Sequence, residues 1–450
     1  MTQGEAQITQ KREAEYEEEV RTLTRRHVLV PWVAQRPLAH PVIDHADGCW
    51  LYGPGGRRYL DLSSGLVNAN IGHGHPHVIA AIERQARRVT YVVPTFATDV
   101  RARLARELAA VSPQGRLTRV FFTTGGTEAV ENAIKMARLV TGRFKVLASY
   151  RSFHGGTYGA LTASGESRRW PAEPGIPGIV HFFTPYPYRS PFPVPPEQEA
   201  GAALVHLEQV LQYEGPHTVA AVLLEPIAGS NGVVVPPDGY LQGVREICSR
   251  HGILLILDEV MTGFGRTGRW FAAEHWDVVP DMITFAKGVS AGYVPLGGVL
   301  VSEEVAGYFD DHVLAGGLTY SGHALACAAG LATLEVYRQE GLVERAARME
   351  SALRERLLNL AARHPLIGDV RGKGLFFALE LVKDRATREP WVPWNSPDTG
   401  PTNRLLGALL RRGVYVFGRW NVLILAPPLT IGEPELDFAA EALDGALAEL

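Results

Sequence analysis

Lys287 is the residue in this sequence that is best placed to do chemistry. It follows an apolar, strand-like run over residues 280–286 and precedes a glycine-rich stretch over residues 288–293. It is one of only six lysines, and the other five lie in polar or amphipathic surroundings that suit solvated charges. A lysine at the end of a buried strand must be neutralised, paired with an acid or used covalently. A Schiff base is one such covalent use.

Asp258 is the second candidate, because it ends another apolar run over residues 253–257. A bare carboxylate there would cost several kcal/mol unless it were paired, and a protonated ring nitrogen would provide the pairing. An amine and a carboxylate at strand ends of one sheet suit pyridoxal phosphate (PLP). Two simpler interpretations stay open, namely a buried aspartate that caps a helix and a lysine that extends its amine into solvent.

A candidate phosphate site lies in residues 121–135, which are typical of a strand, a glycine turn and a helix. We expect Thr127 to be the N-cap, with Gly125 and Gly126 in the turn. Backbone N–H groups and the positive end of the helix dipole would then hold a phosphate. Simple helix capping is the alternative interpretation.

Two further segments follow predicted strands. Phe153 and His154 lie in an aromatic, histidine and glycine cluster at a strand end, where a flat ring could stack on a planar cofactor. Glu225 ends another apolar strand, and its carboxylate lies where ligands bind in open α/β sheets. A core phenylalanine, a loop histidine and a surface glutamate are equally good interpretations of these segments alone.

The elements that would position these residues alternate between strand and helix. Residues 42–62 predict a small antiparallel ribbon, residues 77–88 and 99–111 predict helices, and residues 324–339 predict a long helix. A mostly parallel α/β sheet with both faces covered follows from this alternation. Prolines concentrate in residues 171–196, which we expect to be a long surface excursion. The predicted strands are 120–123, 145–149, 219–225, 253–258, 282–286 and 298–301.

The length of 450 residues predicts more than one lobe. We expect an N-terminal segment over residues 1–74 that contains a helix and the ribbon and belongs to a small domain. A large cofactor-binding domain would cover residues 75–335, and a C-terminal small domain residues 336–450.

Composition narrows the function classes. A net charge of −4 with 20% charged residues argues against a nucleic-acid surface. Three scattered cysteines support neither a disulfide framework nor a metal site. The N-terminus is too acidic for a presequence, and no apolar run reaches the roughly 18 residues that a membrane helix needs. We therefore expect a cytoplasmic protein without membrane or nucleic-acid partners.

The chain resembles the class III (omega) aminotransferases, which are PLP-dependent enzymes of fold type I. The resemblance extends from about residue 40 to the C-terminus and is most specific in residues 257–260 and 284–288. It implies a seven-stranded, mostly parallel sheet in the large domain. It also implies that Lys287 forms the Schiff base and moves the substrate proton, while Asp258 keeps the pyridine nitrogen protonated.

The same resemblance assigns the remaining cofactor contacts. Gly125, Gly126 and Thr127 would hold the phosphate, together with Thr319 from the second subunit of a homodimer. The cofactor ring would lie between the other contacts, and Glu225 would lie near both cofactor and substrate, where it could pair with a mobile arginine. The ring contacts implied are Phe153, His154 and Val260.

The resemblance implies a ping-pong transfer of an amino group from a primary amine or omega-amino acid to a keto acid, with pyruvate expected. Arg419 is the candidate for reading a second carboxylate, and Trp32 and Tyr91 are candidates for aromatic pocket walls. A surface arginine and ordinary core aromatics are the alternatives.

Three competing functions remain at this point. An aminotransferase of the 4-aminobutyrate or ornithine type would use 2-oxoglutarate and a donor with a second carboxylate. A PLP-dependent decarboxylase, racemase or aminomutase would use the same Lys287 and Asp258. A nucleotide-binding module could use Gly125 and Gly126, but the sequence lacks a P-loop lysine and a Rossmann fingerprint, and Lys287 would be unexplained.

Overall fold

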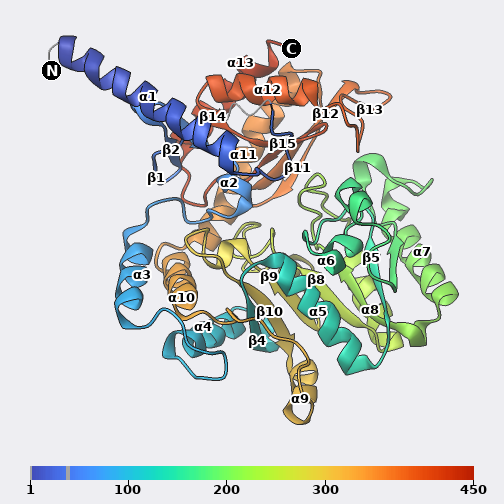
Figure 1. Ribbon diagram of the computed structural model, residues 1–450. Helices are drawn as coiled ribbons and strands as arrows, with labels where there is room; N and C mark the ends of the chain where they lie inside the picture. Colours follow the sequence, from blue (N-terminus) through green and yellow to red (C-terminus); the bar gives the residue numbers. More distant parts are fainter. Residues whose placement is uncertain (1–2, 37–40) are drawn as a thin grey trace.

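A seven-stranded sheet is the centre of the computed structural model, which describes residues 3–36 and 41–450 (Figure 1). Its strand order is β4-β10-β9-β8-β7-β5-β6. Only β10 runs antiparallel to its neighbours, so the sheet is mostly parallel, as expected. The strands are β4 (Leu117–Thr123), β5 (Lys145–Ser149), β6 (Ile179–Phe182), β7 (Val219–Leu224), β8 (Leu254–Asp258), β9 (Met282–Phe285) and β10 (Gly297–Ser302).

The central strands are apolar throughout because both faces of the sheet are covered. Along β7, Leu223 belongs to the core on one face, whereas Val222 and Leu224 belong to the core on the other. Helix α5 crosses the first of these faces. The helices of this part are α3 (Pro76–Arg88), α4 (Asp99–Ala110), α5 (Gly126–Thr141), α6 (Tyr158–Ala163), α7 (Glu199–Glu214), α8 (Tyr240–His251), α9 (Glu303–Asp311) and α10 (Ala324–Gln339).

The six strands predicted from apolar runs are all present, with ends that differ by a few residues. The prediction missed β6, which lies inside the proline-rich segment and pairs with β5 at the sheet edge. The rest of that segment contains short 3-10 turns and no further strand. The long helix over residues 324–339 is confirmed as α10.

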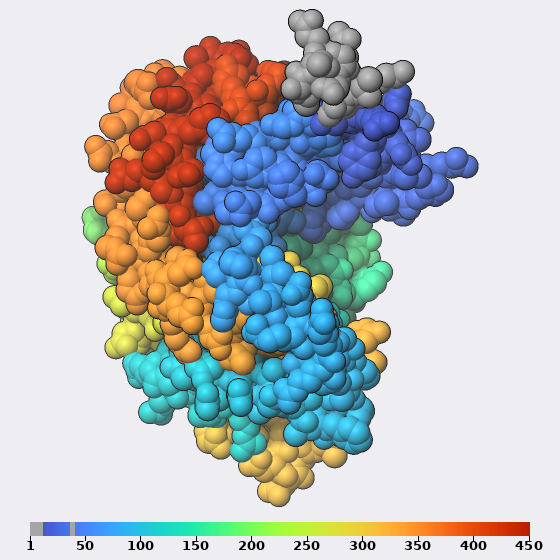
Figure 2. Space-filling view, turned by 90° about the vertical axis from the view of Figure 1, so that its left-hand side faces the viewer, coloured from blue at the N-terminus to red at the C-terminus, as the bar shows by residue number. Residues whose placement is uncertain are grey.

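Two smaller sheets are formed by the N-terminal and C-terminal parts of the chain. The predicted ribbon is confirmed as β1, β2 and β3, and β14 joins it by pairing parallel to β3. Figure 2 shows the resulting contact between the N-terminal segment, in blue, and the C-terminal segment, in red. The proposed domain limits at residues 74 and 335 stay a prediction. These parts contain α1 (Gln3–His27), β1 (His45–Asp47), β2 (Trp50–Tyr52), β3 (Arg58–Asp61), α2 (Ser64–Val67), α11 (Leu342–Arg363), β11 (Ile367–Lys373), β12 (Phe376–Asp384), β13 (Glu389–Pro390), α12 (Gly400–Arg411), β14 (Val414–Tyr415), β15 (Phe417–Arg419), β16 (Val422–Leu425) and α13 (Glu433–Leu447).

Arg266 ties these parts to the large sheet. Its side chain is fully buried and donates hydrogen bonds to the carbonyls of Leu375 at 2.9 Å and Pro427 at 2.6 Å. It also donates to Asn70 Oδ1 at 2.8 Å. One guanidinium therefore bonds to both the N-terminal and the C-terminal segments. Within the described residues, no helix is both long and apolar enough to cross a bilayer.

Candidate active site

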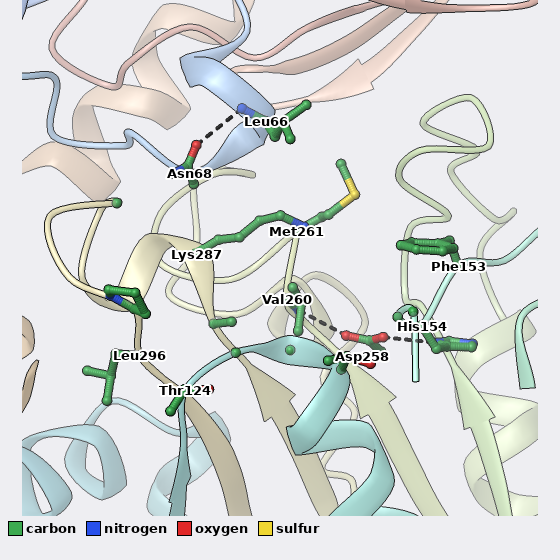
Figure 3. A pocket seen from close by; sticks show the side chains of 18 of the residues that line it. Leu66, Asn68, Thr124, Phe153, His154, Asp258, Val260, Met261, Lys287 and Leu296 are labelled. Carbon is green, nitrogen blue, oxygen red and sulfur yellow. Dashed lines mark hydrogen bonds and ion pairs between the residues drawn. The ribbon is translucent and has the colours of Figure 1, made fainter. Parts of the chain in front are cut away.

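A cavity of about 690 Å³ lies at the ends of the strands that carry the candidate residues (Figure 3). Parallel strands deliver their carboxyl ends to one edge of the sheet, so residues far apart in sequence meet there. Ten of the predicted residues line this cavity: Trp32, Gly125, Gly126, Thr127, Phe153, His154, Glu225, Asp258, Val260 and Lys287.

Asp258 ends β8 with its carboxylate almost completely buried, at 4% exposure. His154 Nδ1 lies 2.7 Å from Asp258 Oδ2, and the Val260 backbone N–H donates to Oδ1 at 3.1 Å. His154 Nε2 is buried without a hydrogen-bond partner in the described part of the chain. The carboxylate is thus oriented by the histidine from one side and still faces the cavity.

The neighbouring carboxylate, Glu259, has a different role. It accepts the backbone N–H groups of Ala272 at 2.9 Å and Ala273 at 2.8 Å, and the hydroxyl of Thr262. Burial raises the pKa of Glu259 to about 7. Glu259 therefore caps the short helix at residues 272–276, which leaves Asp258 as the carboxylate of this strand end that faces the cavity.

Lys287 follows β9 and extends into the cavity (Figure 3). Its backbone is in the left-handed region, with φ of 47°, which is unusual for a residue with a side chain. Among the described residues its amine has no hydrogen-bond or ion-pair partner. Burial lowers the pKa of Lys287, although the Asp258 and Glu225 carboxylates oppose this effect. Such an amine loses its proton more readily than a solvated lysine, as a base or nucleophile requires.

The glycine turn before α5 is the candidate anion cradle. The helix begins at Gly126 with Gly125 as its N-cap, so the prediction that Thr127 is the N-cap was wrong. Thr127 instead lies in the first turn, and its hydroxyl is 2.8 Å from that of Thr157. The Thr157 hydroxyl also donates to Glu131 Oε1 at 2.6 Å. The first turn still presents N–H groups and a positive dipole end, which suit a phosphate.

Gly155 lets the loop after β5 approach this cradle. Its φ of 140° is a conformation that side chains rarely adopt, and a Cβ on it would lie 2.3 Å from Thr127 Oγ1. A larger residue at position 155 would therefore displace either the loop or Thr127. The glycine following the aromatic and histidine pair is needed for this close approach.

Glu225 follows β7 and accepts the backbone N–H groups of Phe153 at 2.9 Å and Gly229 at 2.7 Å. Burial raises the pKa of Glu225 to about 7, while His154 lowers it and Asp258 raises it. The family resemblance implied that Glu225 could pair with a mobile arginine. In the structure its hydrogen bonds are to the backbone, and Arg419 pairs with another glutamate.

That glutamate is Glu166, which the sequence analysis did not single out. Arg419 Nη2 donates to Glu166 Oε2 at 2.5 Å, and Arg168 Nε pairs with Glu166 Oε1. Arg168 lines the cavity, and its guanidinium lies 3.4 Å from the centre of the Phe153 ring. Adjacent arginines at 168 and 169 are a weak sequence signal, because only burial distinguishes the one that lines the cavity.

The remaining candidates, Trp32, Tyr91 and Thr319, do not all lie at the cavity. Trp32 lines the cavity although its side chain is 67% exposed. Tyr91 and Thr319 lie outside this chain's cavity, on an exposed surface where the Tyr91 and Tyr320 rings are 5.9 Å apart. Other cavity residues that were not predicted include Leu66, Asn68, Leu161, Met261 and Leu296.

The residues of the cavity fit PLP. The Asp258 carboxylate is buried and has no lysine or arginine partner among residues 3–36 and 41–450, so a protonated pyridine nitrogen would satisfy it. The Lys287 amine has no partner within the part of the chain that the structure describes. The Phe153 ring and the Val260 side chain offer apolar surfaces for a flat ring. The turn before α5 supplies a phosphate cradle in the same cavity.

Comparisons with known proteins agree with this fit. The family model described as aminotransferase class-III matches residues 33–447. A taurine:2-oxoglutarate aminotransferase from Bifidobacterium kashiwanohense, solved with PLP and glutamate, is 44% identical, with a TM-score of 0.93 over 96% of this chain and 98% of that one. An (S)-enantioselective omega-transaminase from Thermomicrobium roseum is 39% identical, with a TM-score of 0.91 over 96% and 98% of the two chains.

A taurine–pyruvate aminotransferase from Rhodobacter capsulatus is 37% identical over 424 residues, which are 90% of each chain. The family match, these relatives and the fold therefore agree over nearly the whole length. The chain belongs to the class III aminotransferases, which depend on pyridoxal phosphate.

Proposed function

We propose that the protein transfers an amino group from a primary amine donor to a 2-keto acid, with pyruvate as the acceptor, by a ping-pong mechanism. The observation that carries this proposal is that one cavity contains both the buried Asp258 carboxylate and the Lys287 amine, which has no partner among the described residues. An omega-transaminase and a taurine–pyruvate aminotransferase among the relatives support this class of donor and acceptor.

Each residue has a defined role in this proposal. PLP, when bound, supplies an electron-accepting ring that acidifies the substrate Cα–H. Lys287 would hold the cofactor covalently, and its free amine would be the general base at the substrate Cα. Burial favours its neutral form, which is the form able to take a proton. Asp258, held by His154, keeps a proton on the ring nitrogen.

The cofactor contacts follow the same scheme. Gly125, Gly126 and Thr127 would hold the phosphate at the start of α5. Phe153 and Val260 would pack against the ring, and Glu225 would lie at the border between cofactor and substrate.

We further propose a homodimer in which Thr319 completes the phosphate site of the partner subunit. Thr319 and Tyr91 share an exposed surface that also presents apolar side chains, since Val313 is 87% and Tyr320 57% exposed. Exposed large apolar side chains of this kind mark interaction surfaces. Thr319 and Tyr91 would then act in the cavity of the partner.

A second candidate function is transfer between a donor with a distal acid group and 2-oxoglutarate. Two arginines, Arg168 and Arg419, lie beside the cavity, and guanidinium groups bind carboxylates well. The relative that uses 2-oxoglutarate and was solved with glutamate supports this candidate.

Visible absorbance tests the proposed function directly. The purified, PLP-loaded protein should lose its near-visible band when a primary amine is added without any keto acid, and pyruvate should restore the band. Restoration by 2-oxoglutarate alone would favour the second candidate. A band that no amine discharges would contradict both functions.

A further inference from the structure

A three-residue charge cluster borders the cavity, and Glu166 is at its centre. The Glu166 side chain is fully buried, and each of its oxygens pairs with a different arginine: Oε1 with Arg168 and Oε2 with Arg419. Glu166 precedes the short helix Ser167–Ala172, whereas Arg419 ends β15 in the C-terminal part. The cluster thus joins the loop after α6 to the C-terminal sheet.

The charges of this cluster do not balance. Two guanidinium groups share the one carboxylate that pairs with them. Glu225 also acts on Arg168, but burial raises the pKa of Glu225 to about 7, so it offsets the second positive charge only in part near neutral pH. Arg419 Nη1 is buried without a hydrogen-bond partner in the described part of the chain. Burial, followed by repulsion from Arg419, lowers the pKa of Arg168 to about 10. A second anion would therefore stabilise the cluster.

The positive charge of Arg168 lies at the cavity that contains the candidate reacting residues. Arg168 lines the same cavity as Lys287, and its charge contributes to lowering the pKa of that lysine. Its guanidinium stacks on Phe153, and Nη2 donates to Ser230 Oγ at 3.1 Å. Arg168 is therefore held in place by contacts other than Glu166, whereas Arg419 has only Glu166 and the Trp420 ring as partners in the described residues.

We propose that Glu166 is a specificity-determining residue, whose carboxylate competes with the distal acid group of the substrate for Arg168 and Arg419. A short substrate with a sulfonate or carboxylate at the end away from its reacting carbon would supply the missing negative charge. An amine donor without an acid group would leave the excess positive charge of the cluster unpaired. This inference rests on the proposed function, because it names the kind of substrate that the same cavity accepts.

Variants that change the net charge of the cluster distinguish competition by Glu166 from a merely structural role of Glu166. The cluster carries +1 with Glu166, Arg168 and Arg419 intact. Glu166→Gln raises it to +2, and Arg419→Met lowers it to zero. The double variant returns it to +1, although it has lost two of the three side chains. Anion affinity should follow this order, because electrostatic attraction increases with the charge of the cluster.

Isothermal titration of 2-hydroxyethanesulfonate into the PLP-loaded enzyme measures this affinity. The probe has the distal anion but no amine, so it cannot react. Glu166→Gln should tighten binding about tenfold, and Arg419→Met should weaken it about tenfold. The double variant should bind within about threefold of the natural chain. A purely structural Glu166 would give no such rescue.

Glu173→Gln is the matched control. Glu173 is a half-exposed glutamate that directly follows the short helix Ser167–Ala172. It pairs with Arg169 outside the cavity. Its substitution should leave the affinity within about twofold. A parallel titration with 3-hydroxypropionate shows whether a sulfonate or a carboxylate is the preferred anion, since the same order of variants should hold for the anion that binds.

Unchanged or weaker anion binding in a folded Glu166→Gln variant would overturn the proposal, as would the absence of binding in both the natural chain and this variant. If Glu166→Gln fails to fold, Arg168→Met and Arg419→Met test the proposal instead. Each of these two variants should weaken anion binding. Unaltered anion binding in either variant would refute the proposed competition for the two arginines. The proposed function fails on a different measurement, because its test is the response of the cofactor absorbance to an amine.

Discussion

The Lys287 amine lies where burial has removed much of the water that would stabilise an ammonium ion. The two carboxylates that face it, Asp258 and Glu225, act in the opposite direction, and burial outweighs them. A solvated lysine would be almost fully protonated near neutral pH. The position of Lys287 between a buried strand and a turn thus favours the neutral amine that the proposed proton transfer requires.

This lowered pKa predicts a pH-dependent stability of the PLP-free protein. Below the lowered pKa the amine is protonated in both the folded and the unfolded chain. Between that pKa and the usual 10.5, only the unfolded chain binds the proton, so the free energy of unfolding rises with pH. Urea unfolding of the natural chain and of Lys287→Met, compared from neutral to alkaline pH, isolates this contribution.

The stability advantage of the Met variant should shrink as the pH rises through this window. A difference that stays constant would show that the amine has the same pKa in both states. The direction of the change is the decisive observation, because other titrating groups cancel when the two chains are compared at each pH.

Asp258→Asn should remove most of the activity and leave the fold intact. An amide cannot balance a protonated ring nitrogen, but it keeps the shape and one acceptor for the Val260 N–H. We expect kcat to fall at least about 100-fold, with a thermal melt close to that of the natural chain. Asp277→Asn, an exposed aspartate in a left-handed turn, is the control. Activity close to normal in Asp258→Asn would remove Asp258 from its assigned role.

The sequence predicted Lys287 and Asp258 because each follows an apolar run that ends at one edge of the sheet. It did not predict Arg168 or Glu166, since both lie in a loop where no periodicity reports burial. A glutamate beside two arginines in a sequence of many arginines is usually a solvated pair. Only the packing of the C-terminal strand β15 against this loop places Arg419 beside Glu166.

At the scale of elements, the proposed phosphate cradle depends on contact between two helices, α5 and α6. Glu131 on α5 accepts the N–H groups of Gly159 at 2.7 Å and Ala160 at 3.1 Å in the first turn of α6. The same oxygen accepts the Thr157 hydroxyl, which in turn holds the hydroxyl of Thr127. One carboxylate therefore fixes the start of α6 and orients a residue of the cradle.

Glu131→Ala should weaken PLP binding more than it slows catalysis. Loss of the Glu131 carboxylate frees Thr157 and Thr127 to rotate, and we expect the Kd for PLP to rise about tenfold. At saturating PLP, kcat should change by less than about twofold. Absorbance titration of the PLP-free protein gives Kd, and Glu83→Ala, at an exposed position of α3, is the control. An unchanged Kd would show that Thr127 needs no such support.

Elements were predictable where their pattern was continuous. The strands around Leu223 and Ile256 are apolar throughout. Such continuous apolar runs are typical of strands that are buried on both faces of a sheet. Strand β6 has His181 within a proline-rich segment, so its short run gave no comparable signal. The start of α5 was placed too late because a threonine is a stronger N-cap signal than the glycine that occupies the cap.

At the scale of the whole molecule, the cavity depends on segments from both ends of the chain. The N-terminal Trp32 lines it. The C-terminal strand β15 brings Arg419 to Glu166, which also pairs with the cavity residue Arg168. Arg266 bonds both terminal segments to the large sheet. One predicted contact, Thr319, lies outside this cavity, which is why the proposed function requires a second copy of the chain.

Mixing two inactive variants tests that requirement. Lys287→Ala removes the reacting amine, and Thr319→Glu places a carboxylate against the phosphate that Thr319 is proposed to bind, so each homodimer should be inactive. In a mixed dimer, one cavity combines the intact Lys287 of the Glu variant with the intact Thr319 of the Ala variant. Unfolding and refolding an equal mixture with PLP should therefore recover about a quarter of the natural activity.

The recovered activity distinguishes the two arrangements of Thr319. If Thr319 acted within its own chain, every cavity in the mixture would lack either the lysine or the threonine, and no activity would return. Refolding each variant alone by the same procedure is the control, and sedimentation measures how much dimer has formed. A mixture that forms dimers but stays inactive would refute the shared site. In a shared site, one cavity of each mixed dimer would contain both an intact Lys287 and an intact Thr319 and would therefore be active.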